Sequence, residues 1–306
     1  MTAVVTVLMA TYNGRDWLPE QAASILDQEG VQVRLVVSDD GSDDGTWEWL
    51  QELAAGDARV RLLPRGERLG TAAANFYRLI AEHVEDDGGY VALSDQDDRW
   101  LPGKLAAQTA LLDAGRYDGV SSDVIAFDES GRRQLLRKSN PQRRYDYLFE
   151  SGGPGSTFVL TPRLVRLVQE QLAQPGGGAR SVEAHDWLIY ALCRAAGWRW
   201  LIEDRSWVDY RQHSDNELGA NKGLRSALWR LRKIKQGWHR QQVLTLTDLA
   251  IGLASDPARS ELEQLRTALC DKGIHGRLQL IKGSAELRRH PRDRAVLAAL
   301  IAAGLW

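Results

Sequence analysis

The first hundred residues repeat one pattern three times, in which a short apolar run ends in polar residues and is followed by a segment with helical periodicity. The apolar runs cover residues 4–10, 31–37 and 90–93. Short apolar runs that stop at turn residues predict buried strands, whereas apolar positions three or four residues apart predict helices. A further brief strand is expected at 60–63. This alternation predicts an α/β fold with a mixed, mostly parallel sheet and helices on both faces.

The second half of the chain has a less regular pattern. We expect short strands at 120–127 and 156–160 around an arginine-rich connector, helices at 162–173 and 183–196, and a strand at 198–202. After Gly219 the pattern is wholly helical. The predicted organisation is therefore an α/β domain over 1–219, with parts 1–105 and 106–219, and a basic helical region over 220–306.

The chain has 306 residues, of which 43% are hydrophobic, so it can bury one large core or two modest ones. Its formal net charge of −2 gives no sign of a nucleic-acid-binding protein. The charge is nevertheless unevenly distributed. Residues 1–100 contain 19 acidic and 8 basic residues, whereas residues 222–306 contain 7 acidic and 16 basic residues. The acidic N-terminal part and the basic C-terminal part are therefore expected to have different roles.

Cysteine usage and hydropathy indicate the compartment. The two cysteines, Cys193 and Cys270, have no CxxC partner and no spacing suited to structural zinc, which favours a reducing environment. The N-terminus has no basic segment before its apolar run, and no later stretch approaches 18 apolar residues. The expectation is a cytoplasmic protein whose contact with a membrane, if any, is peripheral on the inner face of the cytoplasmic membrane.

Acidic residues follow two of the predicted strands, where the carboxyl ends of parallel strands share one rim and ligands bind in α/β sheets. Asp95 and Asp97 form an Asp-x-Asp pair, a spacing that can hold a hard divalent ion bridging a diphosphate. Asp39 and Asp40 end the second strand. Simpler interpretations remain open at this point: a solvated acidic loop for the first pair, and a helix-capping turn for the second.

These residues stand in longer segments that resemble the successive signatures of family 2 glycosyltransferases, which have the GT-A fold. The matching segments cover residues 10–14, 38–46, 75–76 and 94–102. The resemblance extends over about 1–215 and implies a nucleotide-diphospho-sugar donor, Mn²⁺ or Mg²⁺ as cofactor, and inversion at the anomeric carbon. Asp97 would hold the metal. The residues that would bind the nucleotide-sugar are Thr11, Tyr12, Asn13, Asp39, Asp40, Asn75, Asp95 and Gln96.

Two later segments extend the resemblance. The segment 151–158 is similar to the family's glycine-rich segment, where backbone approaches the sugars, and 183–187 is similar to the segment that supplies the catalytic base, here Asp186. A glycine turn and an acidic residue in the first turn of a helix are the simpler alternatives. The residues expected near the acceptor or donor sugar are Trp100, Gly155, Ser156, Thr157, His185 and Trp187.

The segment 210–219 resembles the bacterial rhamnosyltransferase-like branch of the family, in which its histidine, here His213, can complete the metal site. This favours dTDP-L-rhamnose as donor and a cell-surface glycan as acceptor, such as a lipopolysaccharide core, an O-antigen or an exopolysaccharide. UDP-hexoses remain open, because Arg68 stands where the family often has asparagine. A catalytically silent binding module of the same fold is the alternative from another class, although silent copies usually lose carboxylates that are present here.

The basic tail supports two interpretations. Residues 222–241 contain seven basic residues and no acidic residue, with apolar positions at helical spacing. Such a helix can pack its apolar stripe on the catalytic domain, or it can lie on an anionic membrane near a lipid-linked acceptor. The absence of GxGxxG after the first strand argues against a dinucleotide-binding dehydrogenase.

Overall fold

The computed structural model describes residues 2–83, 88–212 and 236–306. These residues form one nine-stranded sheet in the order β3, β2, β1, β4, β8, β6, β9, β5, with β7 paired to the outside of β6. The strands are β1 (Ala3–Thr11), β2 (Val31–Asp39), β3 (Val60–Leu62), β4 (Tyr90–Ser94), β5 (Arg99–Trp100), β6 (Gly119–Asp128), β7 (Arg133–Leu136), β8 (Val159–Leu160) and β9 (Trp200–Gln212).

Helices connect most of these strands and form the C-terminal region. The α-helices are α1 (Leu18–Leu26), α2 (Thr46–Gly56), α3 (Ala72–His83), α4 (Lys104–Asp113), α5 (Asp146–Phe149), α6 (Pro162–Ala173), α7 (His185–Ala195), α9 (Trp238–Leu253), α10 (Ala258–Cys270), α11 (Ile274–Lys282) and α12 (Pro291–Ala302). Three 3₁₀ turns are η1 (Gly155–Thr157), η2 (Gly178–Ser181) and η3 (Ser284–Glu286).

The sheet is mixed, as predicted, and its longest ladders are parallel. The strands β1, β2, β3 and β4 pair in parallel, and so do β6 and β9. The short strand β8 lies antiparallel between β4 and β6 and joins the two parallel parts. Three local expectations differ from the structure in extent. Residues 155–157 form a 3₁₀ turn, so that β8 covers only Val159–Leu160, and the strand expected at 198–202 is the much longer β9. The arginine-rich connector contains the additional strand β7.

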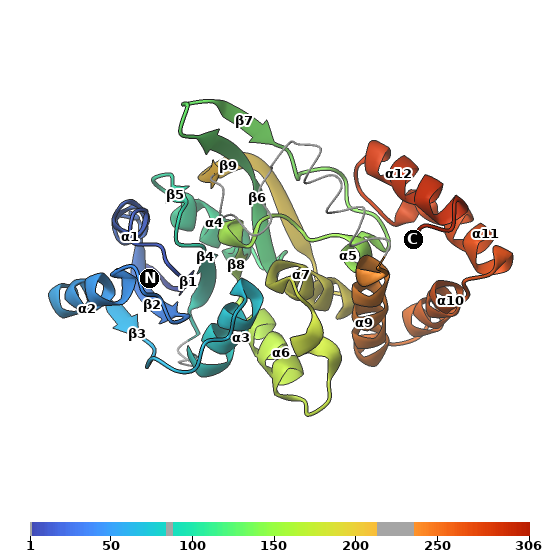
Figure 1. Cartoon of the computed structure of the whole chain (residues 1–306), viewed down its shortest axis with the longest axis horizontal. Coiled ribbons are helices and arrows are strands. Elements are labelled where there is room, and N and C mark those ends of the chain that lie inside the picture. The colour runs from blue at the N-terminus through green and yellow to red at the C-terminus, as the bar shows by residue number, and fades with distance from the viewer. Residues whose placement is uncertain (1, 84–87, 213–235) are drawn as a thin grey trace.

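Alternating side chains of the central strands enter two hydrophobic cores. In β1, Val5, Val7 and Met9 pack with α1, α2 and α4 on one face of the sheet. Leu8 and Ala10 point to the opposite face, where α3, α6 and α7 cover the sheet. Helices therefore lie on both faces, as Figure 1 shows, and the apolar runs of the sequence are strands buried on both sides.

The C-terminal helices continue the second of these cores. Val243, Leu246 and Ala250 of α9 are buried in the same cluster as Leu188 and Leu192 of α7. In Figure 1 the helices α9 to α12 lie beyond α5 and α7, on the side of the molecule away from α1 and α2. The described part of the basic tail therefore packs against the helix that begins at His185 and Asp186.

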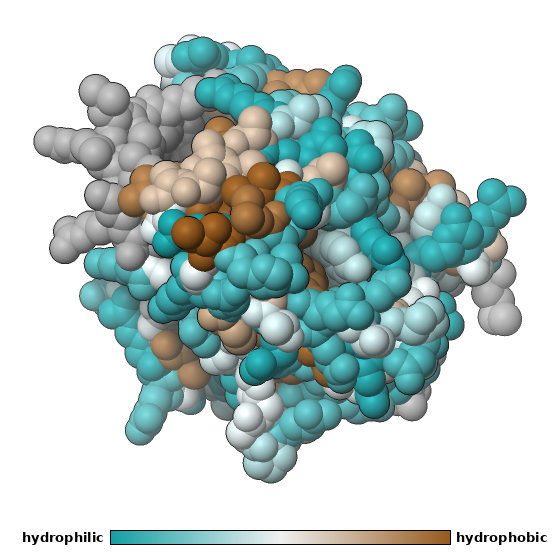
Figure 2. Space-filling view, turned by 90° about the vertical axis from the view of Figure 1, so that its right-hand side faces the viewer, coloured by the Kyte–Doolittle hydropathy of each residue, from teal (hydrophilic) through white to brown (hydrophobic). Residues whose placement is uncertain are grey.

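The face of the molecule that bears the C-terminal helices exposes apolar side chains (Figure 2). Ile274 and Leu278 of α11, Val296 of α12, and Leu305 are exposed large hydrophobic residues. None of the helices in 2–83, 88–212 and 236–306 is long and apolar enough to cross a membrane. Of the predicted membrane-contacting stretch 222–241, residues 222–235 lie outside the described residues.

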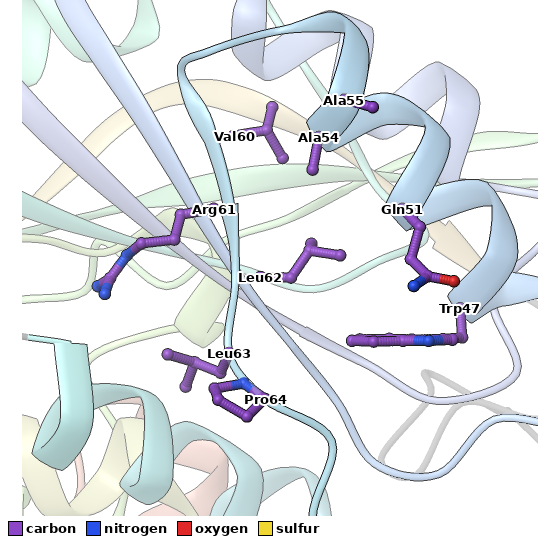
Figure 3. A pocket seen from close by; sticks show the side chains of 9 residues that line it. All are labelled: Trp47, Gln51, Ala54, Ala55, Val60, Arg61, Leu62, Leu63 and Pro64. Atoms are coloured by element: carbon purple, nitrogen blue, oxygen red, sulfur yellow. The ribbon is translucent and has the colours of Figure 1, made fainter.

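A surface hollow of about 530 Å³ lies beside the edge strand β3 (Figure 3). Trp47 and Gln51 of α2 line one side of it, and Leu62, Leu63 and Pro64 line the other. None of the residues predicted to bind donor, metal or acceptor lines this hollow. The candidate site lies instead at the carboxyl ends of the central strands.

Candidate active site

The ends of β1, β2 and β4 form the rim that the sequence predicted. Thr11 at the end of β1 is paired with Asp39 of β2, and Met9 is paired with Ser94 at the end of β4. The predicted nucleotide-binding residues that directly follow these strands are therefore neighbours in space. The sheet order thus brings residues from separate segments to one place.

The loop after β1 is held from both sides. The Gln96 side chain accepts from the Tyr12 backbone N–H at 2.8 Å and donates to the Tyr12 carbonyl at 2.8 Å. Asn13 has a positive φ of 49°, and its side chain accepts from the backbone N–H of Asp43 at 3.0 Å. Gln96 and Asn13 therefore shape the loop, and Tyr12 stands at its surface with 38% of its area exposed.

Asp39 and Asp40 are buried and bonded to backbone. Asp40 accepts from the N–H groups of Leu69 and Gly70 at 2.5 and 2.8 Å, and Asp39 accepts from the N–H of Ser42 at 3.1 Å. The carboxylate of Asp40 thus fixes the loop that precedes α3. Arg68, which precedes Leu69 and Gly70, departs from the family pattern. Its guanidinium lies 4.2 Å from the centre of the Tyr12 ring.

The side chains of Thr11 and Asn75 are buried below the surface of the rim. Asn75 is 2% exposed and donates to the Ser38 carbonyl at 2.9 Å. The Thr11 hydroxyl donates to Asp39 at 3.3 Å. Both side chains therefore hold the ends of β1 and β2 together, so their contribution to nucleotide binding is to position Asp39 and the loops.

The three aspartates after β4 crowd together. Asp98 is 1% exposed, and its pKa is raised well above its ordinary value by burial and by the negative charges of Asp97 and Asp95. The nearby Ser156 hydroxyl and a hydrogen bond of 3.1 Å from the Arg211 N–H lower that pKa in part. Because Ser156 belongs to the glycine-rich segment, this segment lies beside the acidic loop.

The acidic loop after β4 offers carboxylate oxygens, the donor type that divalent cations prefer. Asp95 and Asp97 are half-buried, and three carboxylates within electrostatic reach of one another favour a bound cation that offsets their repulsion. Within 2–83, 88–212 and 236–306, however, no group of three or more His, Cys, Asp and Glu side chains is arranged to hold a metal. The predicted ligand His213 lies outside the described residues. The strand β9 ends beside the acidic loop, where the Arg211 side chain donates to the Asp97 carbonyl at 2.8 Å.

Trp100 is buried in the sheet core, and its ring makes a cation–π contact with Lys104. The Lys104 ammonium lies 3.8 Å from the centre of the Trp100 ring and makes no hydrogen bond within the described part of the chain. Burial lowers its pKa to about 7, and the charges of Asp98 and Glu203 act in the opposite direction. Trp100 therefore does not face a sugar directly, and its ring supports a buried amine close to Asp98.

Gly155 is required by the position of His185. A Cβ atom added at Gly155 would lie 2.3 Å from Nε2 of His185, a distance that no side chain tolerates. The His185 ring stacks on Phe76 with 3.9 Å between ring centres, and burial lowers its pKa to about 3, so it is neutral. The glycine-rich segment and the start of α7 are therefore in direct contact, with Thr157 buried at the end of η1.

Asp186, the predicted base, lies at the first turn of α7. Its carboxylate accepts from the Trp187 N–H at 2.7 Å, and it also interacts with the Ser151 hydroxyl. Burial raises its pKa to about 6, while Trp187, Ser151 and the positive charge of Lys138 lower it in part. A carboxylate with this pKa is a stronger base than an ordinary one and is still mainly ionised at pH 7.

The middle and the last turn of α7 are tied to α5 by a buried charged network around Asp146. This carboxylate accepts from Tyr190 Oη at 2.9 Å, from Arg289 at 3.0 Å and from Arg194 at 3.3 Å. Arg289 also donates to the Ser151 carbonyl at 2.5 Å. Trp187 is buried, donates to the Tyr147 carbonyl at 2.9 Å and packs on the ring of His239 in α9. Trp187 therefore joins α7 to the C-terminal helices, and its place near a sugar stays a prediction.

Four residues near the site were not singled out from the sequence: Lys104, Lys138, Ser151 and Arg289. Lys104 had a local signal, because a cation in the first turn of a helix is disfavoured by the helix dipole and so needs another reason to be there. Ser151 stood within a segment already matched to the family. Lys138 belongs to the basic connector that the sequence showed, whereas Arg289 had no signal, and only the tertiary structure relates them to Asp186 and Ser151.

Comparison with known proteins identifies the family of the chain. Residues 6–166 match the model of the family described as glycosyl transferase family 2. The chain is 33% identical over 294 residues to the dTDP-rhamnosyl transferase RfbG of Shigella flexneri, covering 96% of this chain and 98% of the relative.

Two solved structures share the fold. A fragment of TarS from S. aureus in complex with UDP-GlcNAc superposes with a TM-score of 0.59 at 13% identity, covering 99% of this chain and 81% of that one. The mannosyltransferase PcManGT from Pyrobaculum calidifontis, in complex with GDP-Man and Mn²⁺, gives a TM-score of 0.55 at 18% identity, covering 99% of this chain and 80% of that one. The fold is therefore that of GT-A glycosyltransferases. Together with the family match, it shows that the chain is a glycosyltransferase and belongs to glycosyl transferase family 2.

Proposed function

We propose that the enzyme transfers L-rhamnose from dTDP-L-rhamnose to a hydroxyl of a cell-surface glycan acceptor, with inversion at the anomeric carbon. The observation that supports this donor most strongly is the 33% identity to a dTDP-rhamnosyl transferase over nearly the whole of both chains. The rim formed by β1, β2 and β4 is the proposed nucleotide-sugar site, because its loops contain Tyr12, Asp40 and Asp95 side by side.

The proposed reaction is a single in-line displacement. The acceptor oxygen forms a bond to the anomeric carbon while the bond from that carbon to the diphosphate breaks, and the electron pair leaves with the nucleoside diphosphate. The proton of the attacking hydroxyl moves to the Asp186 carboxylate. The pKa of about 6 supports this role, since Asp186 is ionised near pH 7 and still binds a proton readily.

Mn²⁺ or Mg²⁺ is the proposed cofactor, with Asp97 as the ligand from the described residues and His213 as a further ligand. Such an ion would supply positive charge beside the departing diphosphate. The crowding of Asp95, Asp97 and Asp98 supports an ion at this place. The protein's own contribution there is to hold the acidic loop through Arg211 and to exclude water by burying Asp98.

The first test of this proposal is calorimetry of dTDP, UDP, GDP and CDP with and without Mn²⁺, followed by transfer assays with the matching sugars. Metal-dependent binding of dTDP and transfer from dTDP-L-rhamnose are the expected results. Selective binding of UDP would replace the donor with a UDP-hexose and keep the glycosyltransferase. Absence of binding for every nucleotide would contradict the proposed donor site and favour a silent module.

A lipid-linked acceptor and peripheral membrane contact remain part of the proposal. The exposed apolar residues Ile274 and Leu278 lie on α11 together with the exposed Lys282, a combination suited to an anionic membrane surface. Flotation with anionic vesicles at physiological salt tests this. Binding should be lost in the double variant Ile274→Glu, Leu278→Glu, and a wild-type chain that stays unbound would overturn the membrane contact.

A further inference from the structure

His239, in the first turn of α9, lies within an aromatic cluster next to the proposed base. The centre of its ring is 5.4 Å from that of Trp187, 5.8 Å from that of Trp306 and 6.5 Å from that of Phe149. Phe149 and Trp306 stack on each other with 5.9 Å between ring centres. The cluster therefore joins the segment after α12 to the helices α5, α7 and α9, which lie side by side (Figure 1).

The two ring nitrogens of His239 have different partners. The Trp306 indole N–H donates to Nδ1 at 2.9 Å, and because an indole N–H can only donate, the proton of the neutral histidine ring is on Nε2. Nε2 then donates to the Phe149 carbonyl at 3.3 Å, which also accepts from Arg288 at 3.2 Å. Burial, and next the charge of Arg288, lower the pKa of His239 to about 4, so the ring is neutral near pH 7.

Trp306 is itself held against α9. It is 9% exposed, and its backbone carbonyl accepts from the Arg240 guanidinium at 3.0 Å. The same guanidinium lies 5.3 Å from the centre of the Trp306 ring and donates to the Leu269 carbonyl in the last turn of α10 at 2.9 Å. Hydrogen bonds on both nitrogens therefore fix the orientation of the His239 ring, and the residue that bonds Nδ1 is held in turn.

The two groups that hold the Asp186 carboxylate belong to segments that His239 contacts. Trp187 donates its backbone N–H to Asp186 at 2.7 Å, and its ring packs on His239. The Trp187 indole N–H is bonded to the Tyr147 carbonyl of α5 at 2.9 Å, so this ring has a fixed orientation as well. Ser151, whose hydroxyl interacts with Asp186, follows Phe149 by two residues. A displacement of His239 would consequently reach Asp186 through both segments.

We propose that His239, oriented by Trp306, is a positioning residue for the Asp186 carboxylate, through which the C-terminal helices contribute to the transfer step. This inference rests on the proposed role of Asp186 as the base. A misplacement of about 1 Å at a reacting group can lower a rate about 10²-fold, so packing that fixes a base contributes to kcat. Within the described residues, the hydrogen bonds and ring contacts of His239 involve none of the predicted nucleotide-binding residues. Donor binding should therefore not depend on it.

The first measurement is the release of dTDP from dTDP-L-rhamnose by the full chain, with Mg²⁺ and with water in place of an acceptor. The water oxygen bonds to the anomeric carbon, the electron pair of the broken bond leaves with dTDP, and a water proton moves to Asp186. His239→Ala removes both contacts, His239→Phe keeps a ring against Trp187, and His239→Gln keeps a donor for the Phe149 carbonyl. The matched control is Leu280→Ala, which removes buried packing of α11 in the same C-terminal region.

A second measurement does not depend on turnover. Amide hydrogen exchange, followed by NMR on the ¹⁵N-labelled chain, reports the hydrogen bond from the Trp187 N–H to the Asp186 carboxylate. The amide of Leu192, in a later turn of α7, reports whether the whole helix opens. A change at Trp187 alone identifies loss of the positioned carboxylate and separates it from general unfolding.

We expect His239→Ala to lower kcat for dTDP release about tenfold or more, with the KM for dTDP-L-rhamnose unchanged within about twofold. Exchange of the Trp187 amide should become about tenfold faster, and that of Leu192 should change much less. His239→Phe, His239→Gln and Trp306→Phe each keep part of the arrangement, so their losses should be smaller than those of His239→Ala. Leu280→Ala should change neither quantity.

Two results would overturn the inference. Either His239→Ala keeps both its kcat and the slow exchange of Trp187, or Leu280→Ala produces the same losses, because general packing would then be responsible. Failure of the proposed function is a separate result: Asp186→Asn would still release dTDP, or the wild-type chain would release none. The exchange of Trp187 in His239→Ala would then decide by itself whether His239 positions the Asp186 carboxylate.

Discussion

The proposed donor side and the proposed acceptor side of the site are built differently. On the donor side, the carboxylate of Asp40 is held by backbone N–H groups of Leu69 and Gly70, within the first hundred residues. On the acceptor side, the carboxylate of Asp146 is held by side chains of Tyr190, Arg194 and Arg289, the last of them 143 residues away. The donor side therefore depends on local turns, and the acceptor side depends on tertiary contacts between distant segments.

This difference has a functional meaning. Loops at strand ends that are stabilised by hydrogen bonds to backbone N–H groups can bind the nucleoside diphosphate with few specific side chains. The acceptor side must position one carboxylate, Asp186, and the charged groups around it, so it draws on α5, α7 and the C-terminal region. Substitutions on the two sides should consequently produce separable defects.

The largest expected effect is on catalysis by Asp186→Asn. Loss of the general base should lower kcat by about 10²–10⁴-fold, while dTDP binding stays unchanged because the donor loops are not touched. Steady-state kinetics and calorimetry on the same preparation measure both quantities. Glu170→Gln, an exposed acid on α6, is the matched control. A variant with full kcat would exclude Asp186 as the base.

The next effect is on stability. Arg289→Met should lower the free energy of unfolding by about 3–5 kcal/mol, because Asp146 would remain buried with less compensating charge. Arg266→Met should cost far less, since Arg266 and Asp248 form an ion pair that water screens, with side chains 46% and 51% exposed. Denaturant unfolding compares the two. Equal losses would show that the Asp146 network adds nothing beyond a surface pair.

A smaller effect is expected on the donor side. Asp40→Ala leaves the N–H groups of Leu69 and Gly70 without their acceptor, at a cost of about 1–3 kcal/mol. The loop before α3 should loosen and dTDP should bind about tenfold more weakly, with kcat less affected than by Asp186→Asn. Asp43→Asn, at an exposed neighbouring acid, should leave dTDP affinity unchanged. Undiminished dTDP affinity in Asp40→Ala would remove this loop from the donor site.

The smallest expected effect is a shift in the pH profile of kcat, caused by the charge of Lys138 acting on Asp186. Asp186 acts as a base only when ionised, so kcat should fall as pH drops through about 6. The positive charge of Lys138 lowers the pKa of Asp186, so Lys138→Gln should raise that pKa and move the acidic limb of the profile to higher pH by less than about one unit. Lys272→Gln should not move it. A shift to lower pH would contradict this placement of Lys138.

The sequence predicted the strands of the proposed donor side and the acids that follow them, and fewer of the contacts on the proposed acceptor side. The acids at the ends of β2 and β4, and the strands before them, follow from local patterns and a family resemblance. The contact of Gly155 with His185 and the approach of Ser156 to Asp98 agree with the segments chosen. The contacts of Lys138 and Arg289 with the site could not be predicted, because a local sequence pattern does not indicate which distant segments pack together. Trp100 and Trp187 were assigned to the sugars, but both are buried as packing groups.

The bond between Asp146 and Arg289 also has a consequence for synthesis on the ribosome. Asp146 and the whole of α7 leave the ribosome well before Arg289, and N-terminal parts of a chain generally fold first. The nascent protein therefore lacks one partner of Asp146, and one donor to the Ser151 carbonyl, until Arg289 has been translated and has left the ribosome. We expect a translating chain to acquire nucleotide binding before it acquires sugar transfer, so that the enzyme becomes active only after the segment with Arg289 has been made.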